Sequence, residues 1–287
     1  MKIGLVLSGG FARGAAQEGF LKGLLEGVKR EEIDMISASS IGALNAFGLS
    51  TNNMGYLERL YQTSDYLNLR KLKLSLKNHL VDSIVDEMLS LNNKIEIPFY
   101  LTGTCMNNLS THYFYFDSNS DFDELKKVLN LSMAFPVVNG LYKKEFNRIY
   151  IDGGATDNIP VFPFLAHNED IIIILHCYAS YLPPKMLLEK NHFVIDIDVT
   201  TRCRESVSSF ALSKKNLTEM YRDGYEYGKE FSRYVFCDNR LEGIKQRGQY
   251  FIRQEAEKRN KKKPTFFSLV SFLNKIQLSR GFKIDNN

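Results

Sequence analysis

The sequence lacks the closely spaced cysteines that build a disulfide framework or a zinc site. Its four cysteines, at positions 105, 177, 203 and 237, are scattered along the chain and form no C-x-x-C pair. Such usage favours a reducing cytoplasm. The five histidines are equally dispersed and show no metal-ligand spacing. We therefore expect a cytoplasmic protein without a bound metal.

Long apolar runs are missing as well. No segment is long enough to cross a bilayer, and the apolar run Ile171–Cys177 has the length of a buried strand. Met1–Leu7 leads directly into Ser-Gly-Gly and lacks the apolar region and cleavage site of a signal peptide. With 287 residues, 44% of them hydrophobic, the chain is long enough to bury one large core, alone or with a small extension.

Charge is unevenly distributed along the chain. The net charge is +4, but residues 240–287 contain 12 Lys and Arg against 4 Asp and Glu, which leaves −4 for the first 239 residues. The change of sign predicts a main domain over residues 1–238 and a basic helical extension over residues 239–287. The extension either packs against the main domain or lies on an anionic surface such as a membrane.

Strand and helix patterns alternate over the first 50 residues. Lys2–Leu7 and Ile33–Ser37 are apolar and strand-like, whereas Ala15–Val28 and Ile41–Leu49 have helical character. A right-handed βαβ unit places the loops after both strands side by side, at the carboxyl edge of a parallel sheet. The pattern predicts an α/β layered fold.

The alternation continues through the rest of the chain. Tyr56–Leu91 is predicted to be mostly helical, and two strands form a hairpin around residues 107–108. Glu205–Cys237 is predicted as a long amphipathic helix that Gly224 and Gly228 weaken. No internal repeat interrupts this order.

The turn between the second strand and the second helix contains only small residues, among them Ala38, Ser40 and Gly42. This is the pattern of a nucleophile elbow with Ser40 at its tip, where the following helix N-terminus favours developing negative charge. The usual G-x-S-x-G is A-S-S-I-G here, so Ala38 replaces the first glycine. The alternative is an ordinary turn in which the serine caps the helix.

A glycine-rich loop, Ser8–Gly14, follows the first strand. It does not match a dinucleotide fingerprint, because Phe11 stands where a glycine is required, and no G-K-[ST] marks a P-loop. Beside Ser40, the backbone N–H groups around Gly10 and Phe11 are suited to an oxyanion hole. Arg13 either holds the loop or adds positive potential.

A serine nucleophile needs a base, and Asp152 is better placed than any histidine. Asp152 ends a predicted strand in front of two glycines, so its carboxylate can approach another loop closely. His167, His176 and His192 lie near strands without a recognisable catalytic arrangement. A carboxylate can accept the hydroxyl proton directly and return it to the leaving group. The alternative is that Asp152 only caps a turn.

Together these segments resemble the patatin-like phospholipase family. Ser8–Gly14 is similar to its oxyanion loop, Ala38–Ala46 to its elbow and Asp152–Pro160 to its aspartate segment, and Met133–Val138 lies where the family has a loop lining the site. The resemblance covers residues 1–235 and implies a three-layer α/β/α sandwich with a mostly parallel central sheet. It also implies a Ser–Asp dyad that hydrolyses acyl esters, of phospholipase A or lysophospholipase type, without metal or organic cofactor.

The resemblance assigns roles residue by residue. It implies Ser40 as nucleophile and Asp152 as base, with Gly9, Gly10, Phe11, Arg13 and Gly14 in the oxyanion loop and Ala38 and Gly42 in the elbow. The implied partners are a lipid or acyl ester and an anionic membrane surface, and we expect no nucleic acid. Acyl transfer to an acceptor other than water is an alternative, because the same nucleophile permits it. A catalytically weak lipid-binding relative is another, because a bulky Phe11 disfavours the positive φ that glycine allows.

Overall fold

The computed structural model describes residues 1–63, 80–134, 140–178, 181–203, 213–238 and 240–261. The strands are β1 (Ile3–Leu7), β2 (Ile33–Ala38), β3 (Phe99–Cys105), β4 (Ser110–Phe116), β5 (Lys143–Glu145), β6 (Arg148–Asp152), β7 (Ile171–His176) and β8 (Phe193–Asp198). The α-helices are α1 (Gly14–Leu24), α2 (Ile41–Ser50), α3 (Met54–Thr63), α5 (Leu80–Leu91), α6 (Phe122–Ser132), α7 (Lys185–Leu188), α8 (Lys214–Val235) and α9 (Leu241–Lys261). Of the stretch predicted to be helical over Tyr56–Leu91, residues 64–79 lie outside the described ranges.

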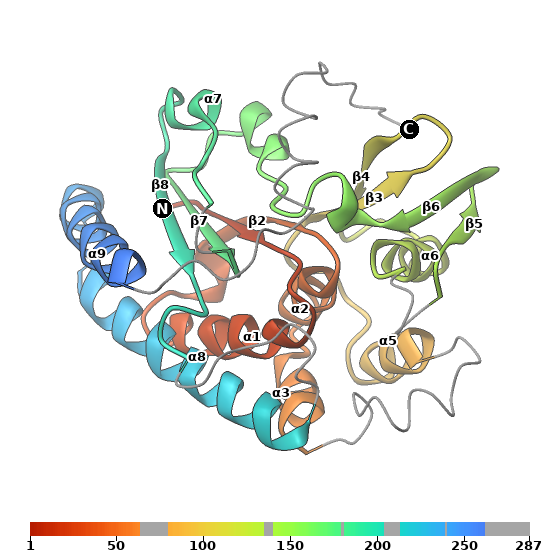
Figure 1. Cartoon of the computed structure of the whole chain (residues 1–287), viewed down its shortest axis with the longest axis horizontal. Helices are drawn as coiled ribbons and strands as arrows, with labels where there is room; N and C mark the ends of the chain where they lie inside the picture. Colours follow the sequence, from red (N-terminus) through yellow and green to blue (C-terminus); the bar gives the residue numbers. More distant parts are fainter. Residues whose placement is uncertain (64–79, 135–139, 179–180, 204–212, 239, 262–287) are drawn as a thin grey trace.

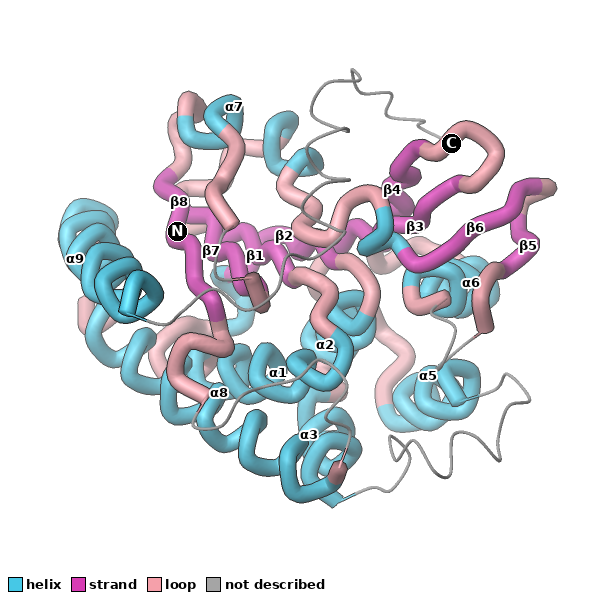
Figure 2. Tube along the Cα trace, viewed as in Figure 1, coloured by secondary structure: helices cyan, strands magenta, loops and turns pink. Residues whose placement is uncertain are grey.

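One central sheet organises the chain (Figures 1 and 2). Its strand order is β5-β6-β3-β2-β1-β7-β8, with β4 also paired to β3. The five strands β3, β2, β1, β7 and β8 are parallel neighbours, whereas β4, β5 and β6 pair antiparallel. The predicted α/β fold with a mostly parallel sheet is therefore confirmed.

Alternate residues of β1 show how the sheet is covered on both faces. Ile3, Leu5 and Leu7 are fully buried in a core cluster shared with residues of α1, α2 and α8. Val6 belongs to a second cluster, with Phe164 of a short 3₁₀-helix and with a residue of α7. Successive side chains of a strand point to opposite faces. The first cluster therefore lies on the side of α1 and α8, below the sheet in Figure 1, and the second above it.

Two strands meet end to end along β3. β2 ends at Ala38, opposite Leu101 of β3, and β6 runs the other way and ends at Asp152, opposite Gly103. Both strands therefore stop at the same place on the same edge of β3, separated by the single residue Thr102. The loops that follow β2 and β6 are consequently forced together.

Helix α8 packs along α1 at very close range. A Cβ on Gly224 of α8 would collide with the carbonyl oxygen of Ala16, and a Cβ on Gly19 of α1 would collide with that of Tyr221. Gly228 makes the same kind of contact with the next turn of α1. The glycines expected to weaken this helix therefore allow the backbones to touch. The helix begins later than predicted, at Lys214, and residues 204–212 lie outside the described ranges.

The first part of the predicted extension packs on the rest of the molecule. Ile244 of α9 is fully buried, the ring of Phe251 lies 5.1 Å from that of Phe231, and Glu255 pairs with Arg202 at 3.0 Å. Residues 262–287, which include the apolar and basic end of the extension, lie outside the described ranges. Neither α9 nor any other helix within those ranges is long and apolar enough to cross a bilayer.

The α1–α8 contact predicts opposite effects for two Gly→Ala substitutions. Gly224→Ala adds a methyl group where backbone atoms leave no room, so we expect the free energy of unfolding to fall by about 2–3 kcal/mol. Gly55→Ala in α3 is the control, because the nearest heavy atom to its Cβ is 4.0 Å away, and we expect a gain of up to about 0.5 kcal/mol. Urea unfolding measures both. Equal effects of the two substitutions would contradict the close contact.

Candidate active site

Ser40 stands at a strained turn between β2 and α2. Its backbone has φ 54° and ψ −128°, outside the regions that non-glycine residues usually adopt. Its side chain makes no capping hydrogen bond to α2. Instead, Ser40 Oγ donates a hydrogen bond to Asp152 Oδ2 at 2.7 Å. The alternative in which this serine caps the helix is therefore excluded.

The turn is tight because α2 begins directly against β1. A Cβ on Gly42 would lie 2.5 Å from the carbonyl oxygen of Leu7 and 2.7 Å from that of Ser8. Any larger residue at position 42 would push α2 away from the sheet. Ala38, which replaces the usual first glycine, is fully buried in the core cluster, so its methyl group is accommodated.

Asp152 is fixed from several sides. Its Oδ1 accepts a hydrogen bond from the N–H of Gly154 at 2.8 Å, and its own N–H donates to the carbonyl oxygen of Ala134 at 3.1 Å. Thr104 Oγ1 donates to its carbonyl oxygen at 2.8 Å. One carboxylate oxygen therefore caps the turn, while the other accepts the hydrogen bond from Ser40. Residues 135–138 of the neighbouring Met133–Val138 loop lie outside the described ranges.

Burial raises the pKa of Asp152 to about 6. The hydrogen bonds from Ser40 and Gly154 act in the opposite direction, because they stabilise the charged form, but they are outweighed. The carboxylate is therefore a stronger base than an exposed aspartate and is still largely ionised at neutral pH. Such a shifted group in contact with a hydroxyl is typical of a catalytic site.

The glycine-rich loop lies directly against the serine. A Cβ on Gly9 would be 2.8 Å from Ser40 Cβ, and a Cβ on Gly14 would be 2.5 Å from Ile41 Cγ1. Phe11 adopts φ 57°, in the left-handed region that its side chain disfavours. The loop thus has the conformation that a glycine would adopt most easily, at a cost in strain.

Arg13 holds this loop to the end of β7. Its Nη1 donates to the carbonyl oxygen of Cys177 at 3.0 Å, and its backbone N–H donates to the carbonyl oxygen of Gly10 at 3.2 Å. Gly10 packs against the same residue, because a Cβ there would lie 2.8 Å from Cys177 Sγ. These hydrogen bonds support the first of the two roles considered for Arg13, that of holding the loop.

Asn158 ties the aspartate loop to the glycine-rich loop, a role that the sequence did not indicate. The N–H of Gly9 donates to the carbonyl oxygen of Asn158 at 3.2 Å, and Asn158 Nδ2 donates to the carbonyl oxygen of Gly9 at 3.3 Å and to Tyr178 Oη at 2.6 Å. Its Oδ1 fills the space where a Cβ on Gly9 or Gly154 would lie. The only signal was a polar residue just before Ile-Pro, in a segment predicted as a turn.

Two buried amides fix α1 and α2 beneath the site. Gln17 Nε2 donates to the carbonyl oxygens of Ser8 and Leu175, both at 3.1 Å. Asn45 Nδ2 donates to Gln17 Oε1 and to the carbonyl oxygen of Gly14, both at 3.0 Å. These bonds tie the helix that follows the elbow to the start of the helix that follows the glycine-rich loop. Sequence reasoning assigned neither residue.

Among the residues that the structure describes, neither a histidine nor a cluster of metal ligands takes part in this arrangement. No histidine of the described ranges hydrogen-bonds to Ser40 or Asp152, and His176 instead contacts Asp196 at 2.6 Å across β7 and β8. Within the same ranges, no group of three or more His, Cys, Asp or Glu is arranged to hold a metal ion.

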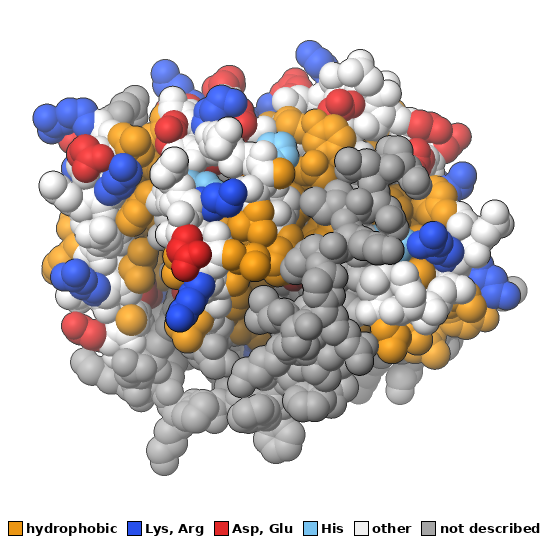
Figure 3. Space-filling model, turned by 90° about the horizontal axis from the view of Figure 1, so that it is seen from above, with side chains coloured by type: hydrophobic (Ala, Val, Ile, Leu, Met, Phe, Trp, Pro, Cys, Tyr) orange, Lys and Arg blue, Asp and Glu red, His pale blue; other side chains and the backbone are white. Residues whose placement is uncertain are grey.

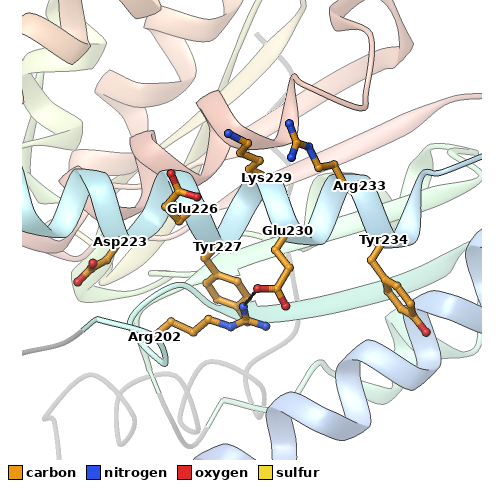
Figure 4. Close-up of a pocket in the computed structure, with 8 residues that line it drawn as sticks. All are labelled: Arg202, Asp223, Glu226, Tyr227, Lys229, Glu230, Arg233 and Tyr234. Carbon is orange, nitrogen blue, oxygen red and sulfur yellow. Dashed lines mark hydrogen bonds and ion pairs between the residues drawn. The ribbon is translucent and has the colours of Figure 1, made fainter.

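A groove of about 590 Å³ runs along α8 (Figure 4). None of its lining residues belongs to the glycine-rich loop, the elbow or the Asp152–Pro160 segment. Arg202 lies over the ring of Tyr227, 4.3 Å from its centroid, and pairs with Glu230. Lys229 and Arg233 both pair with Glu26, at 3.8 and 3.2 Å. Since its cations are already neutralised by carboxylates, the groove is an ion-pair network that joins α8 to its neighbours.

The raised pKa of Asp152 predicts a pH-dependent stability. The folded chain binds this proton more tightly than the unfolded chain, so the contribution is present below about pH 4 and is lost as pH rises through about 6. Relative to Asp152→Asn, we expect wild type to lose roughly 1–3 kcal/mol of unfolding free energy between about pH 4 and about pH 7. Urea unfolding of both proteins across this pH range measures the difference. The same pH dependence of the unfolding free energy in wild type and Asp152→Asn would contradict the prediction.

Comparison with known proteins gives two kinds of likeness. Among solved structures, VipD from Legionella pneumophila is 13% identical, with a TM-score of 0.46 over 80% of this chain and 66% of that one. The ExoU–SpcU complex from the type III secretion system of Pseudomonas aeruginosa is 17% identical, with a TM-score of 0.34 over 89% of this chain and 59% of that one. The chain thus spans less than two thirds of either neighbour's length. Among curated protein sequences, none matches significantly.

The second likeness is to a family model. The model for patatin-like phospholipases matches residues 5–165, more than half of the chain. The matched region runs from β1 to the 3₁₀-helix that follows the aspartate loop, and it contains both Ser40 and Asp152. The chain therefore belongs to the patatin-like phospholipase family.

Proposed function

We propose that the chain hydrolyses acyl esters of lipids, with Ser40 as nucleophile and Asp152 as base. The observation that carries this proposal is the 2.7 Å hydrogen bond from Ser40 Oγ to Asp152 Oδ2. Membership of the patatin-like phospholipase family supports a lipid substrate. Within that class, we propose a phospholipase A or lysophospholipase type of reaction.

Acylation starts with the attack of Ser40 Oγ on the ester carbonyl carbon. As the bond forms, the hydroxyl proton moves to Asp152 Oδ2, which already accepts its hydrogen bond. The carbonyl oxygen becomes an oxyanion, which the backbone N–H groups of the adjacent loop around Gly10 and Phe11 stabilise. The bond to the alcohol then breaks, and the alcohol takes the proton from Asp152 and leaves acyl-Ser40 behind.

Deacylation repeats the sequence with water. Asp152 accepts a proton from the water molecule as its oxygen attacks the acyl carbon, and the same loop stabilises the second oxyanion. The bond to Ser40 Oγ then breaks, Ser40 takes the proton back from Asp152, and the fatty acid is released. One carboxylate therefore serves as base and acid in both halves.

The geometry also explains how a carboxylate can replace a histidine. An exposed aspartate is a weak base, whereas burial raises the pKa of Asp152 to about 6, close to the operating pH at which general bases are most effective. Its second oxygen is held by the N–H of Gly154. A backbone N–H therefore orients the base, and no third side chain is needed for this.

We expect Ser40→Ala and Asp152→Asn each to lower kcat/KM for lipid and p-nitrophenyl esters by at least about a thousandfold. Ser40→Ala removes the attacking oxygen and Asp152→Asn removes the proton acceptor, while neither creates a clash, so neither should unfold at a lower temperature than wild type at neutral pH. Ester hydrolysis and fluorophosphonate labelling of Ser40 are the measurements.

Ser39→Ala is the matched control for this pair. Its hydroxyl is buried next to Ser40 and has no hydrogen-bond partner among the described residues. We therefore expect activity and labelling close to wild type. Near-wild-type turnover in Ser40→Ala or Asp152→Asn would refute the dyad.

The rate should depend on pH through Asp152. Because the base must be ionised, we expect kcat/KM to fall about tenfold per pH unit below an apparent pKa of about 6. A soluble ester whose own ionisation is constant over this range is the appropriate substrate. A profile that stays flat from about pH 5 to about pH 8 would contradict the assignment of Asp152 as base.

A further inference from the structure

Two hairpins, β3–β4 and β5–β6, form a continuous surface beyond the carboxyl edge of the parallel sheet. β3 continues for four residues past Leu101, which pairs with the last residue of β2. The hairpins are joined at two places. The N–H of Met106, at the β3–β4 turn, donates to the carbonyl oxygen of Ile149 at 2.8 Å, and the ring of Phe146, at the β5–β6 turn, stacks on that of Phe114 in β4, 5.7 Å away. In Figure 1 both project at the right-hand side.

Apolar side chains are exposed on and beside the tips of these hairpins. Met106, Leu109, Phe146 and Ile149 lie at or next to the two turns, and Leu141 and Tyr142 lie just before β5. We call these six residues, each 38–63% exposed, the hairpin-tip surface. Single exposed apolar residues are common on proteins, whereas several on one pair of hairpins point to an interaction site.

Two residues of the hairpin-tip surface also have strained backbone conformations. Leu109 has φ 53° and Phe146 has φ 51°, in the left-handed region that Gly and Asn favour. Phe146 and Asn147 form the two-residue turn between β5 and β6, where Asn-Gly is the usual sequence. Burial offsets this strain only in part, because Leu109 remains 61% and Phe146 42% exposed.

The charges beside the hairpin-tip surface are mostly positive. The β3–β4 hairpin contains no Lys, Arg, Asp or Glu, whereas the β5–β6 hairpin contains Lys143, Lys144 and Arg148 against Glu145 and, at the end far from the turn, Asp152. Within the described ranges, Lys144 and Arg148 form no ion pair, and Arg148 Nη1 lies 3.2 Å from His112 Nε2. Figure 3 shows Lys and Arg side chains beside hydrophobic ones at the right-hand end of the molecule.

We propose that the hairpin-tip surface inserts into an anionic lipid surface and so brings Ser40 to its substrate. Apolar side chains enter the acyl region, while Lys144 and Arg148, which form no ion pair with any described residue, contact the phosphates of the head groups. Arg148 is four residues from Asp152 along β6, roughly 13 Å at about 3.3 Å per residue. The inference rests on the proposed function in one respect: the lipid bound is also the substrate.

Vesicle binding tests the surface without turnover when all variants carry Ser40→Ala. The paired substitution Leu109→Asn and Phe146→Asn removes the apolar side chains and suits the left-handed backbone. The relieved strain offsets the lost stacking of Phe146 on Phe114, so the unfolding temperature should stay close to that of the parent. We expect this pair to weaken binding to phosphatidylcholine vesicles containing phosphatidylglycerol about tenfold or more. Lys144→Gln with Arg148→Gln should remove the preference over vesicles of phosphatidylcholine alone.

Leu188→Asn is the matched control. Leu188 is 53% exposed and ends α7, which precedes the amino end of β8 and so lies at the other edge of the sheet. We expect this variant to bind vesicles as the Ser40→Ala parent does.

The absence of tryptophan from the chain allows a direct measurement of insertion. Phe146→Trp creates a single reporter at the tip, and its emission should shift to the blue and be quenched by brominated lipid. Leu188→Trp should show neither change. Equal quenching at the two positions would overturn the proposal.

Two further results would also overturn it: a parent that binds no vesicles, and unchanged binding by the Asn pair. If in addition truncation before Pro264 abolished binding, the membrane contact would belong to the end of the chain instead.

The proposed function is judged separately with a soluble short-chain ester, which the hairpin variants with Ser40 intact should hydrolyse like wild type. If wild type cleaves no ester while the hairpins still govern vesicle binding, the proposed function fails and the surface stands.

Discussion

The site depends on where two strands stop. β2 and β6 run toward each other along the same edge of β3. Their last residues pair with Leu101 and Gly103, so only Thr102 lies between their ends. Gly153 makes the approach possible, because a Cβ there would be 2.7 Å from the carbonyl carbon of Thr102 and closer still to its oxygen. Since side chains alternate along a strand, a shift of one residue in β6 would turn Asp152 away from Ser40.

Much of the local structure was predictable from the sequence. The buried strands are short apolar runs, and the loops after β1, β2 and β6 stand out because they collect small residues where the backbone must turn sharply. Ser40 and Asp152 were identifiable for that reason. The parallel order of β1 and β2 followed from the handedness of the βαβ unit.

What the sequence did not show depends on contacts between distant segments. The pairing of β6 with β3 is antiparallel and joins residues about 50 positions apart, and no local pattern encodes it. Asn158, Gln17 and Asn45 are buried amides whose partners are backbone groups of other loops. The positive φ of Phe11 was equally hidden, because its side chain predicts the opposite.

The close contact between α1 and α8, which Gly19, Gly224 and Gly228 allow, affects how the chain folds. The helix that follows the glycine-rich loop is made early in synthesis, but its partner arrives some two hundred residues later, at Tyr221–Gly228. Contacts this distant along the chain form slowly, because a long loop must close first. A nascent chain therefore contains Ser40, the proposed nucleophile, long before α8 is available to pack against α1, and the complete fold forms only when α8 has emerged.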